Sequence, residues 1–582
     1  MHDGWGGSNP HILTARGPSG ASSRVFVVAV FILLIPAAFQ VVILFQGWAE
    51  TPTAFTGARL SVYPPPTQAS VSDQLTFSTY LGGDGVDQGE TVAVDANGNV
   101  YVVGQTAAPS LPDTPGFPVT PGAFDSILRG ESDGFVAKFN ATGIPEFITF
   151  LGGTGADNAL DVAVDNSGSV YVSGWTDSTD FPTTADAFNR NNSGGRDGFL
   201  AKLSPDGANL LYASYIGGSG QDEVAHLALG PDSTVYFTGT IDSPDFPITP
   251  GAYDTTLDGT SDAYAARLDV QGDRLLFSTY LGGTSSDFSR DIAVDGSGSP
   301  IVVGTTDSYD FPTSSGAFDA TLNGTDGFVV RLNADGTDLP YGSFFGGSGS
   351  DGITSLALDE NGLVSATGYT ASTDLPTTEG ALSRVYHGGN SDSFLFRMNP
   401  QGALLYSTFV GGSGDDNGQA VAVDGAGTTY LLGVTSSTDF PTTSDAMSKV
   451  NRGFTDSYIL TLDSPGTAIS YSSYFGGSGW DHGALLAVDN ESHVYVTGST
   501  GSSDFPVTVG AFDTTLDGSS DAFVARMRIP KPAESPIPPS LPCGLLFTPL
   551  IGGLGLVAWA LPLRSRNRRA EPGSHEPEKT RK

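Results

Sequence analysis

An aspartate follows each of seven glycine pairs in the middle of the chain. Carboxylate oxygens are ligands that hard cations prefer, so a ring of such side chains would suit Ca²⁺. In the alternative interpretation, each aspartate accepts backbone N–H bonds within its own glycine-rich turn. Because every copy repeats the residue, the pattern favours the turn interpretation, and Ca²⁺ is the one cofactor that the sequence suggests. The seven positions are Asp87, Asp157, Asp222, Asp287, Asp351, Asp416 and Asp481.

Aromatic and basic residues that interrupt the repetition are the candidates for ligand binding. They lie in, or next to, the segments that are expected to form loops. Aromatic rings with polar neighbours on exposed loops suit a glycan or a peptide. The alternative is that any one of them is an incidental loop residue. The candidates are Trp175, Arg196, Tyr386, His387, Trp480 and His482.

Motifs of known catalytic chemistry are scarce. The chain contains no G-x-S-x-G, no H-E-x-x-H, no P-loop and no complete EF-hand series. Its single cysteine, Cys543, excludes an intrachain disulfide and a cysteine-based zinc site. Carboxylates are abundant, so an acid pair of the glycosidase type stays open, but nothing singles out two of them. The sequence therefore predicts a protein that is not an enzyme.

The elements that must position these residues recur with a fixed period. The glycine pairs are separated by 70, 65, 65, 64, 65 and 65 residues, which indicates a repeated supersecondary unit. Four segments of the second copy carry strand signals: 146–153, 159–165, 169–176 and 197–203. An Asn-Ser-Gly turn joins the second and third of these segments. Seven sheets of four strands predict an all-β, seven-bladed β-propeller.

The two ends of the repeat array complement each other. The first copy begins with an isolated strand, residues 75–83, and the last copy supplies only the segments 485–489, 493–499 and 522–528. We expect the N-terminal strand to complete the last blade, which would close the ring without leaving exposed edges. An Asp-Phe-Pro corner also recurs in most copies, and we expect its aromatic ring to pack between blades.

Composition and charge restrict the partners. With 26 Lys plus Arg against 63 Asp plus Glu, the formal net charge is −37. Such a surface repels nucleic acid and anionic lipid headgroups. Nucleic acid is therefore not an expected partner.

Two uncharged segments frame the repeats. Residues 25–45 and 544–563 are each long enough to cross a hydrocarbon core of about 30 Å as a helix. Basic residues flank them on the sides away from the repeats, so both segments predict that the middle of the chain lies outside the cytoplasm. A cleaved signal peptide is the alternative for the first segment. We expect a cell-surface, membrane-anchored protein.

The resulting division of the chain has seven parts. It runs from a cytoplasmic segment 1–24 and an apolar segment 25–48, through a Pro-rich linker 49–74, the propeller 75–529 and a Pro-rich stalk 530–543, to an apolar helix 544–563 and a basic tail 564–582.

The recurring pieces resemble a known family. STYLGGxGxD, VAVDxxGxVYVxG, SxDFPxT, GAFD and DGFVAK together are similar to the SBBP repeats of bacterial surface proteins, over about residues 75–528. The resemblance implies a scaffold on the cell surface and no assigned reaction. The C-terminal order of Pro-rich spacer, apolar segment and arginine cluster loosely resembles the PEP-CTERM sorting tails, although Ile537-Pro538-Pro539 replaces the Pro-Glu-Pro motif.

Three functions follow as hypotheses. The first is a non-enzymatic surface scaffold for adhesion or for binding a glycan or protein ligand. The second is a secreted propeller hydrolase or lyase that acts on polysaccharide. The third is a structural module that depends on Ca²⁺ for its fold.

Overall fold

The computed structural model describes residues 31–32, 41–42, 74–107, 116–463 and 466–530, and the chain divides into two compact units, residues 1–69 and 70–582. In the first unit, β1 (Phe31–Ile32) pairs antiparallel with β2 (Val41–Val42). The expected apolar helix within residues 25–48 is not confirmed, since the four described residues of that segment form these two short strands. The remainder of that segment, the linker to residue 73, and the expected stalk, helix and tail after residue 530 lie outside the described residues.

Within the described residues, no helix is both long enough and apolar enough to cross a bilayer.

The second unit contains seven four-stranded antiparallel sheets, which we number as blades. Blade 1 contains β4 (Asp87–Val94), β5 (Val100–Ala107), β6 (Ser132–Phe139) and β7 (Pro145–Leu151). Blade 2 contains β8 (Asp157–Val164), β9 (Val170–Thr176), β10 (Asp197–Leu203) and β11 (Leu210–Ile216). Blade 3 contains β12 (His226–Leu229), β13 (Val235–Ile241), β14 (Asp262–Leu268) and β15 (Leu275–Leu281). Blade 4 contains β16 (Asp287–Val294), β17 (Pro300–Thr306), β18 (Asp326–Arg331) and β19 (Tyr341–Phe345).

The other three blades follow the same order. Blade 5 contains β20 (Asp351–Leu358), β21 (Val364–Thr370), β22 (Asp392–Met398) and β23 (Leu404–Val410). Blade 6 contains β24 (Asp416–Val423), β25 (Thr429–Thr435), β26 (Asp456–Leu462) and β27 (Ile469–Phe475). Blade 7 contains β28 (Asp481–Val488), β29 (His493–Thr500), β30 (Asp521–Arg528) and β3 (Leu75–Leu81).

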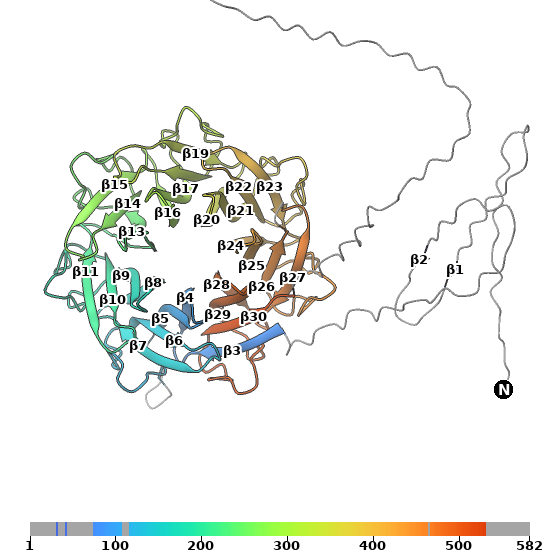
Figure 1. Ribbon diagram of the computed structural model, residues 1–582, viewed down its shortest axis with the longest axis horizontal. Helices are drawn as coiled ribbons and strands as arrows, with labels where there is room; N and C mark the ends of the chain where they lie inside the picture. Colours follow the sequence, from blue (N-terminus) through green and yellow to red (C-terminus); the bar gives the residue numbers. More distant parts are fainter. Residues whose placement is uncertain (1–30, 33–40, 43–73, 108–115, 464–465, 531–582) are drawn as a thin grey trace, which may run out of the picture. The chain divides into compact units, whose positions relative to one another are not determined.

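The blades surround a central axis (Figure 1). The first strand of each blade lies nearest the axis, as β4, β8, β20, β24 and β28 show, and the fourth strand lies on the rim. The all-β, seven-bladed architecture predicted from the repeats is confirmed.

Blade 7 joins the two ends of the array. Strand β3 pairs antiparallel with β30, with Thr79 opposite Val524 and Tyr80 opposite Phe523. The Tyr80 hydroxyl donates to the Ser502 carbonyl at 2.6 Å and accepts a hydrogen bond from the Phe505 N–H at 3.1 Å. The predicted closure with one N-terminal strand and three C-terminal strands is confirmed.

The core lies between neighbouring blades. Strands in the middle of each blade are covered on both faces, so their burial does not alternate along the strand; every residue of β6, for example, is buried. The Asp-Phe-Pro rings belong to this core. Phe311 lies 4.5 Å from Phe328 of its own blade and belongs to a cluster that includes Tyr236 and Phe277 of the preceding blade. The expected packing of this aromatic between blades is confirmed.

Candidate functional site on the loop face

Two kinds of loop share one end of the propeller. The glycine-pair turn links the outer strand of one blade to the inner strand of the next, and a long segment links the second and third strands of each blade. Parallel β-bridges, such as Ser132 with Ala156 and Thr455 with Trp480, place the end of a long segment beside the next turn. We call the end that carries these turns and long segments the loop face.

The glycine-pair aspartates, which are the seven aspartates named first in the sequence analysis, lie inside these turns. Each is at most 1% exposed, and its Oδ2 accepts a hydrogen bond from the N–H of the second glycine at 2.7–2.8 Å. In blades 2 to 7 a serine hydroxyl donates to the same Oδ2 atom, as Ser178 does to Asp157 at 2.8 Å. These hydrogen bonds are those that the turn interpretation predicts. Within the described ranges, no group of three or more His, Cys, Asp or Glu residues is placed to hold a metal.

The aspartate of each Asp-Phe-Pro corner accepts hydrogen bonds from the residue that follows the glycine pair. Asp180 Oδ1 accepts bonds from the backbone N–H of Thr154 at 2.8 Å and from its hydroxyl at 2.9 Å. These bonds to the charged form lower the pKa of Asp180. The sequence analysis assigned a role only to the aromatic ring of this corner, so it missed the role of the aspartate.

A further buried aspartate is the first or second residue of the third strand of every blade. We call these residues the strand-start aspartates, and each accepts a backbone N–H bond from the loop before it, as Asp197 does from Ser193 at 2.8 Å. Each faces a glycine-pair aspartate of the next blade across the first glycine of the turn. A Cβ built on Gly217 would lie 2.6 Å from Asp197 Oδ1 and 3.0 Å from Asp222 Oδ2. The strand-start aspartates are Asp133, Asp197, Asp262, Asp326, Asp392, Asp456 and Asp521.

Substitution of the first glycine of a pair is therefore expected to be costly. In Gly217→Ala the methyl group would overlap two carboxylates, so we expect a loss of about 1–3 kcal/mol in the free energy of unfolding. Gly425→Ala is the matched control, because a Cβ at that position meets no atom within 4 Å. Urea titration of both variants measures the difference, and equal midpoints would mean that the turn tolerates a side chain.

Trp175 and Arg196 lie together in blade 2. They come from neighbouring strand ends, and the Arg196 guanidinium stacks on the Trp175 ring with its carbon 3.5 Å from the ring centre. Two further bonds, from Nε at 3.1 Å and from a terminal nitrogen at 3.2 Å, connect Arg196 to Asp177. The pair therefore forms one ordered aromatic and cationic surface at the loop face.

Trp480 and His482 lie together in blade 7. Their ring centres are 5.3 Å apart, and His482 Nε2 is 3.0 Å from the Thr455 hydroxyl. Burial lowers the pKa of His482, so its imidazole is neutral at pH 7. The pair combines an indole with a hydrogen-bonding imidazole.

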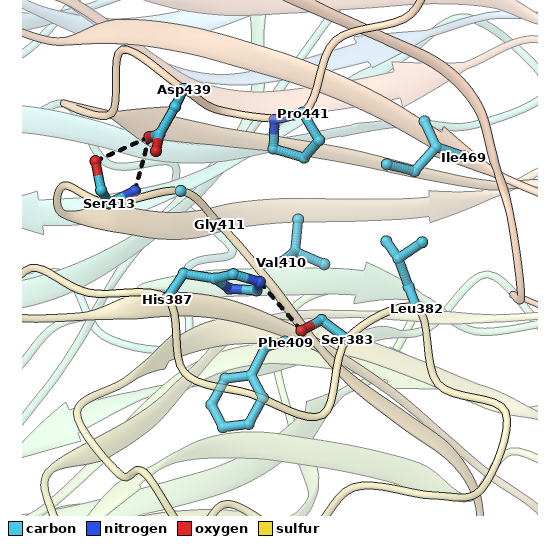
Figure 2. Close-up of a pocket in the computed structure, with 11 residues that line it drawn as sticks. Leu382, Ser383, His387, Phe409, Val410, Gly411, Ser413, Asp439, Pro441 and Ile469 are labelled. Atoms are coloured by element: carbon cyan, nitrogen blue, oxygen red, sulfur yellow. Dashed lines mark hydrogen bonds between the residues drawn. The ribbon is translucent and has the colours of Figure 1, made fainter.

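Tyr386 and His387 lie in the long segment of blade 5, and they differ in role. The Tyr386 ring packs edge-on against Phe409, with the ring centres 6.2 Å apart. His387 lines a pocket of about 390 Å³ (Figure 2). Its Nε2 lies 3.1 Å from the Ser383 hydroxyl and its Nδ1 lies 3.1 Å from Asp392 Oδ2.

The structure thus places the six predicted binding residues as three separate pairs, in blades 2, 5 and 7. The pairs share the loop face, but no contact joins one pair to another among the described residues. Sequence reasoning found the pairs and missed Ser383 and Asp392, because nothing in a loop sequence shows which polar side chains point at a histidine.

Polar residues on the inner strands were also missed. Asp161, His226 and Asp291 occupy the same position of blades 2, 3 and 4, and His226 Nδ1 lies 3.7 Å from Asp161 Oδ2. Asp161 accepts the N–H of Leu227 at 2.8 Å, and Asp291 accepts that of Leu356 at 2.8 Å, so both tie their own blade to the next. Burial raises the pKa of Asp161 to about 8, and the charge of Asp291 adds to this effect. Their spacing of 65 residues was a visible signal.

The repeats are similar to a known family model, and part of the chain is similar to one curated protein. A family model described as Beta-propeller repeat, SBBP, matches residues 76–109, 146–182 and 276–312. The Regulatory protein FlaEY of Caulobacter vibrioides is 28% identical over 367 residues, which is 58% of this chain and 35% of the relative. The chain therefore spans about a third of the length of that relative.

Solved structures resemble the chain more distantly. The acylaminoacyl peptidase of Pyrococcus horikoshii is 10% identical, with 78% of this chain and 52% of that chain covered and a TM-score of 0.36. A polysaccharide lyase of family PL25, an ulvan lyase, is 10% identical, with 77% and 95% covered and a TM-score of 0.36. The β-propeller domain of the Trilobed protease from Pyrococcus furiosus is 9% identical, with 72% and 91% covered and a TM-score of 0.36.

Two of the three family matches run from an outer strand to an Asp-Phe-Pro corner, and the structure builds the same blade seven times. The chain is a seven-bladed β-propeller in which three segments match the SBBP beta-propeller repeat.

Proposed function

We propose that the protein is a propeller scaffold on the outer side of a membrane that binds a surface glycan or protein ligand through its loop face. One observation carries the proposal. The aromatic and basic residues that depart from the repeat gather on this face, while identical hydrogen bonds hold the turns between them in every blade. A rigid frame with variable side chains at one end is how many binding folds present a ligand site.

Charge narrows the class of ligand. The net charge of −37 disfavours polyanions as a whole. A neutral glycan or a peptide suits the aromatic pairs better, because an indole or a stacked guanidinium contacts the apolar face of a sugar or a side chain without a change of net charge. The apolar segments at both ends of the chain support a location outside the cytoplasm, and protease shaving of intact cells would test that location.

Binding to glycan and peptide arrays tests the proposal. Trp480→Ala and Trp175→Ala are each expected to weaken binding about tenfold or more, since buried tryptophans often dominate interfaces. Val270→Ala is the control, because Val270 is 51% exposed in the turn between β14 and β15, at the other end of the blade. Equal binding by all three variants would contradict a role for the loop face.

The calcium hypothesis leads to a separate prediction. Because Oδ2 of each glycine-pair aspartate already accepts bonds in its own turn, we expect the same melting temperature in millimolar Ca²⁺ and after EDTA. A ligand that binds only the folded state raises the melting temperature. A rise of more than about 5 °C with Ca²⁺ would therefore show that native carboxylates bind the ion.

A further inference from the structure

Three side chains of blade 5 form a hydrogen-bonded series at the edge of a pocket. Ser383 Oγ lies 3.1 Å from His387 Nε2, and His387 Nδ1 lies 3.1 Å from Asp392 Oδ2. All three belong to the loop between β21 and β22 or to the first residue of β22. Figure 2 shows the imidazole of His387 directed at the Ser383 hydroxyl.

Each member is positioned by a different part of the repeat. Asp392 is a strand-start aspartate; it is fully buried and also accepts the His387 backbone N–H at 2.6 Å. This double contact fixes the imidazole against the carboxylate. The His387 side chain is 32% exposed, so its other edge reaches the surface. Ser383 stands where most blades have the Asp or Asn of a turn, and its Oγ accepts the Val385 N–H at 3.3 Å.

The order of the contacts has a chemical consequence. A carboxylate beside Nδ1 favours the tautomer that carries its proton on Nδ1, which leaves the lone pair of Nε2 facing the serine hydroxyl. A serine with a basic imidazole at its hydroxyl, and a carboxylate behind that imidazole, is an activated nucleophile. Asp392 can supply the negative charge at neutral pH, because burial raises its pKa to about 6 and the bonds from His387 oppose this rise.

The pocket next to the serine suits an apolar group. Its wall includes the side chains of Leu382, Val410 and Ile469, and a hydrogen-bonded pair, Ser413 and Asp439, lies on the side away from Ser383 (Figure 2). A volume of about 390 Å³ accommodates a small acyl chain beside the nucleophile.

Blade 6 contains the same loop without the imidazole. Ser448 occupies the position of Ser383, and its hydroxyl donates to the Val450 carbonyl at 3.0 Å, as the Ser383 hydroxyl donates to the Val385 carbonyl at 3.2 Å. The strand-start aspartate Asp456 accepts the backbone N–H of Arg452 at 2.9 Å, and Arg452 stands where blade 5 has His387. The two loops therefore differ in the residue that would act as the base, and Ser448 is a built-in reference for an unactivated serine.

We propose that Ser383 is the nucleophile of a carboxylic ester hydrolase, with His387 as its general base and Asp392 as a positioning residue. This activity goes beyond the ligand binding proposed above. The substrate class is an ester whose acyl group is small and apolar. Ser383 Oγ attacks the ester carbonyl carbon while its proton passes to His387 Nε2.

The remaining steps need water as the only co-reactant. The bond between the carbonyl carbon and the alcohol oxygen breaks, the alcohol takes the proton from Nε2, and an acyl-serine forms. Water then adds to the acyl-serine with the same imidazole as base. The carboxylic acid leaves, and Ser383 recovers its proton.

Hydrolysis of 4-nitrophenyl acetate and 4-nitrophenyl butyrate by the full chain in detergent tests the proposal. We expect Ser383→Ala and His387→Arg each to lower kcat at least 100-fold, whereas Ser448→Ala should leave it unchanged. His387→Arg copies blade 6, and the backbone N–H that holds Asp392 stays, so this variant should fold with a melting temperature near that of the wild type. Asp392→Asn should lower kcat more than it changes KM and should alter the pH profile of kcat.

Two results would overturn the proposal. One is a wild-type rate no higher than the uncatalysed rate, and the other is equal rates in the wild type and Ser383→Ala. Neither result would contradict the proposed ligand binding, because Trp175 and Trp480 lie in other blades and their variants report on binding alone.

Discussion

A propeller without strand β3 should lose cooperative folding. The test compares the thermal unfolding of residues 70–530 with that of residues 82–530, which lack the strand that closes blade 7. Four apolar side chains of β3, namely Leu75, Phe77, Tyr80 and Leu81, are at most 4% exposed. At about 1.5–3 kcal/mol for each buried side chain, their removal costs roughly 6–12 kcal/mol. That cost is comparable to the whole stability of about 5–15 kcal/mol of a typical domain.

The loss extends to both neighbours of blade 7. Leu75 and Tyr80 pack in a cluster with residues of blade 6, and Phe77 and Leu81 pack in a cluster with residues of blade 1. The Tyr471 hydroxyl also donates to the Gln74 side chain at 2.9 Å. Circular dichroism should show a broad melt, or none, for residues 82–530, and a synthetic peptide of residues 70–83 should restore part of the transition. An unchanged melting temperature would mean that the ring does not depend on this strand.

The propeller should be more stable at pH 5 than at pH 8. Burial raises the pKa of six glycine-pair aspartates and of all seven strand-start aspartates, and the facing carboxylate adds to the rise at several junctions. The pKa reaches about 7 at Asp87, Asp262 and Asp326 and about 6 at Asp157, Asp197, Asp222, Asp392, Asp456 and Asp521, and it is raised at Asp133, Asp287, Asp416 and Asp481.

The sign follows from proton linkage. Between about pH 4 and pH 7 the folded chain holds more protons on these carboxyls than the unfolded chain does, so the free energy of unfolding falls as the pH rises. We expect the melting temperature to drop by roughly 5–10 °C from pH 5 to pH 8. Below about pH 4 the trend should reverse, because the pKa of the corner aspartates, such as Asp180 and Asp245, is lowered and their protonation releases the turns.

General repulsion between surface charges could also make the stability depend on pH. The salt concentration distinguishes this repulsion from the titration of the buried carboxyls. Repulsion between surface charges is screened at 1 M salt, where the Debye length is about 3 Å, whereas buried carboxylates are screened much less. The pH dependence should therefore persist at 1 M NaCl with EDTA present. Asp262→Asn should reduce it, since that change removes one titrating partner of a facing pair. A flat profile at high salt would assign the effect to the surface.

Much of the fold followed from the repeat alone. Seven copies of four strand signals predicted the blades, and the unmatched strand at 75–83 predicted how the ring closes. Local chemistry was also accessible, because an aspartate four residues after a glycine is well placed to accept its N–H, as Asp157 does from Gly153. These features depend on residues close together in the sequence, or on a regular interval between the repeats.

The candidate sites depend on side-chain contacts that the periodicity of the sequence does not predict. Trp175 and Arg196 are 21 positions apart and meet because β9 pairs with β10. Ser383, His387 and Asp392 match no motif, and only the path of one loop brings their polar atoms into line. The strand-start aspartates are visible in every copy, but a strand pattern alone does not show that such a residue forms half of a buried pair.

If the repeat supplies the frame and departures from it supply the chemistry, only Ser383 should react as a nucleophile. Covalent labelling of the full chain with a fluorophosphonate, followed by peptide mapping by mass spectrometry, distinguishes the two serines. We expect one label per chain on Ser383, no label on Ser448, and no label on Ser383 in His387→Arg. Equal labelling of the two serines, or none on either, would contradict this expectation, because the imidazole of blade 5 would then confer no reactivity that the repeated loop of blade 6 lacks.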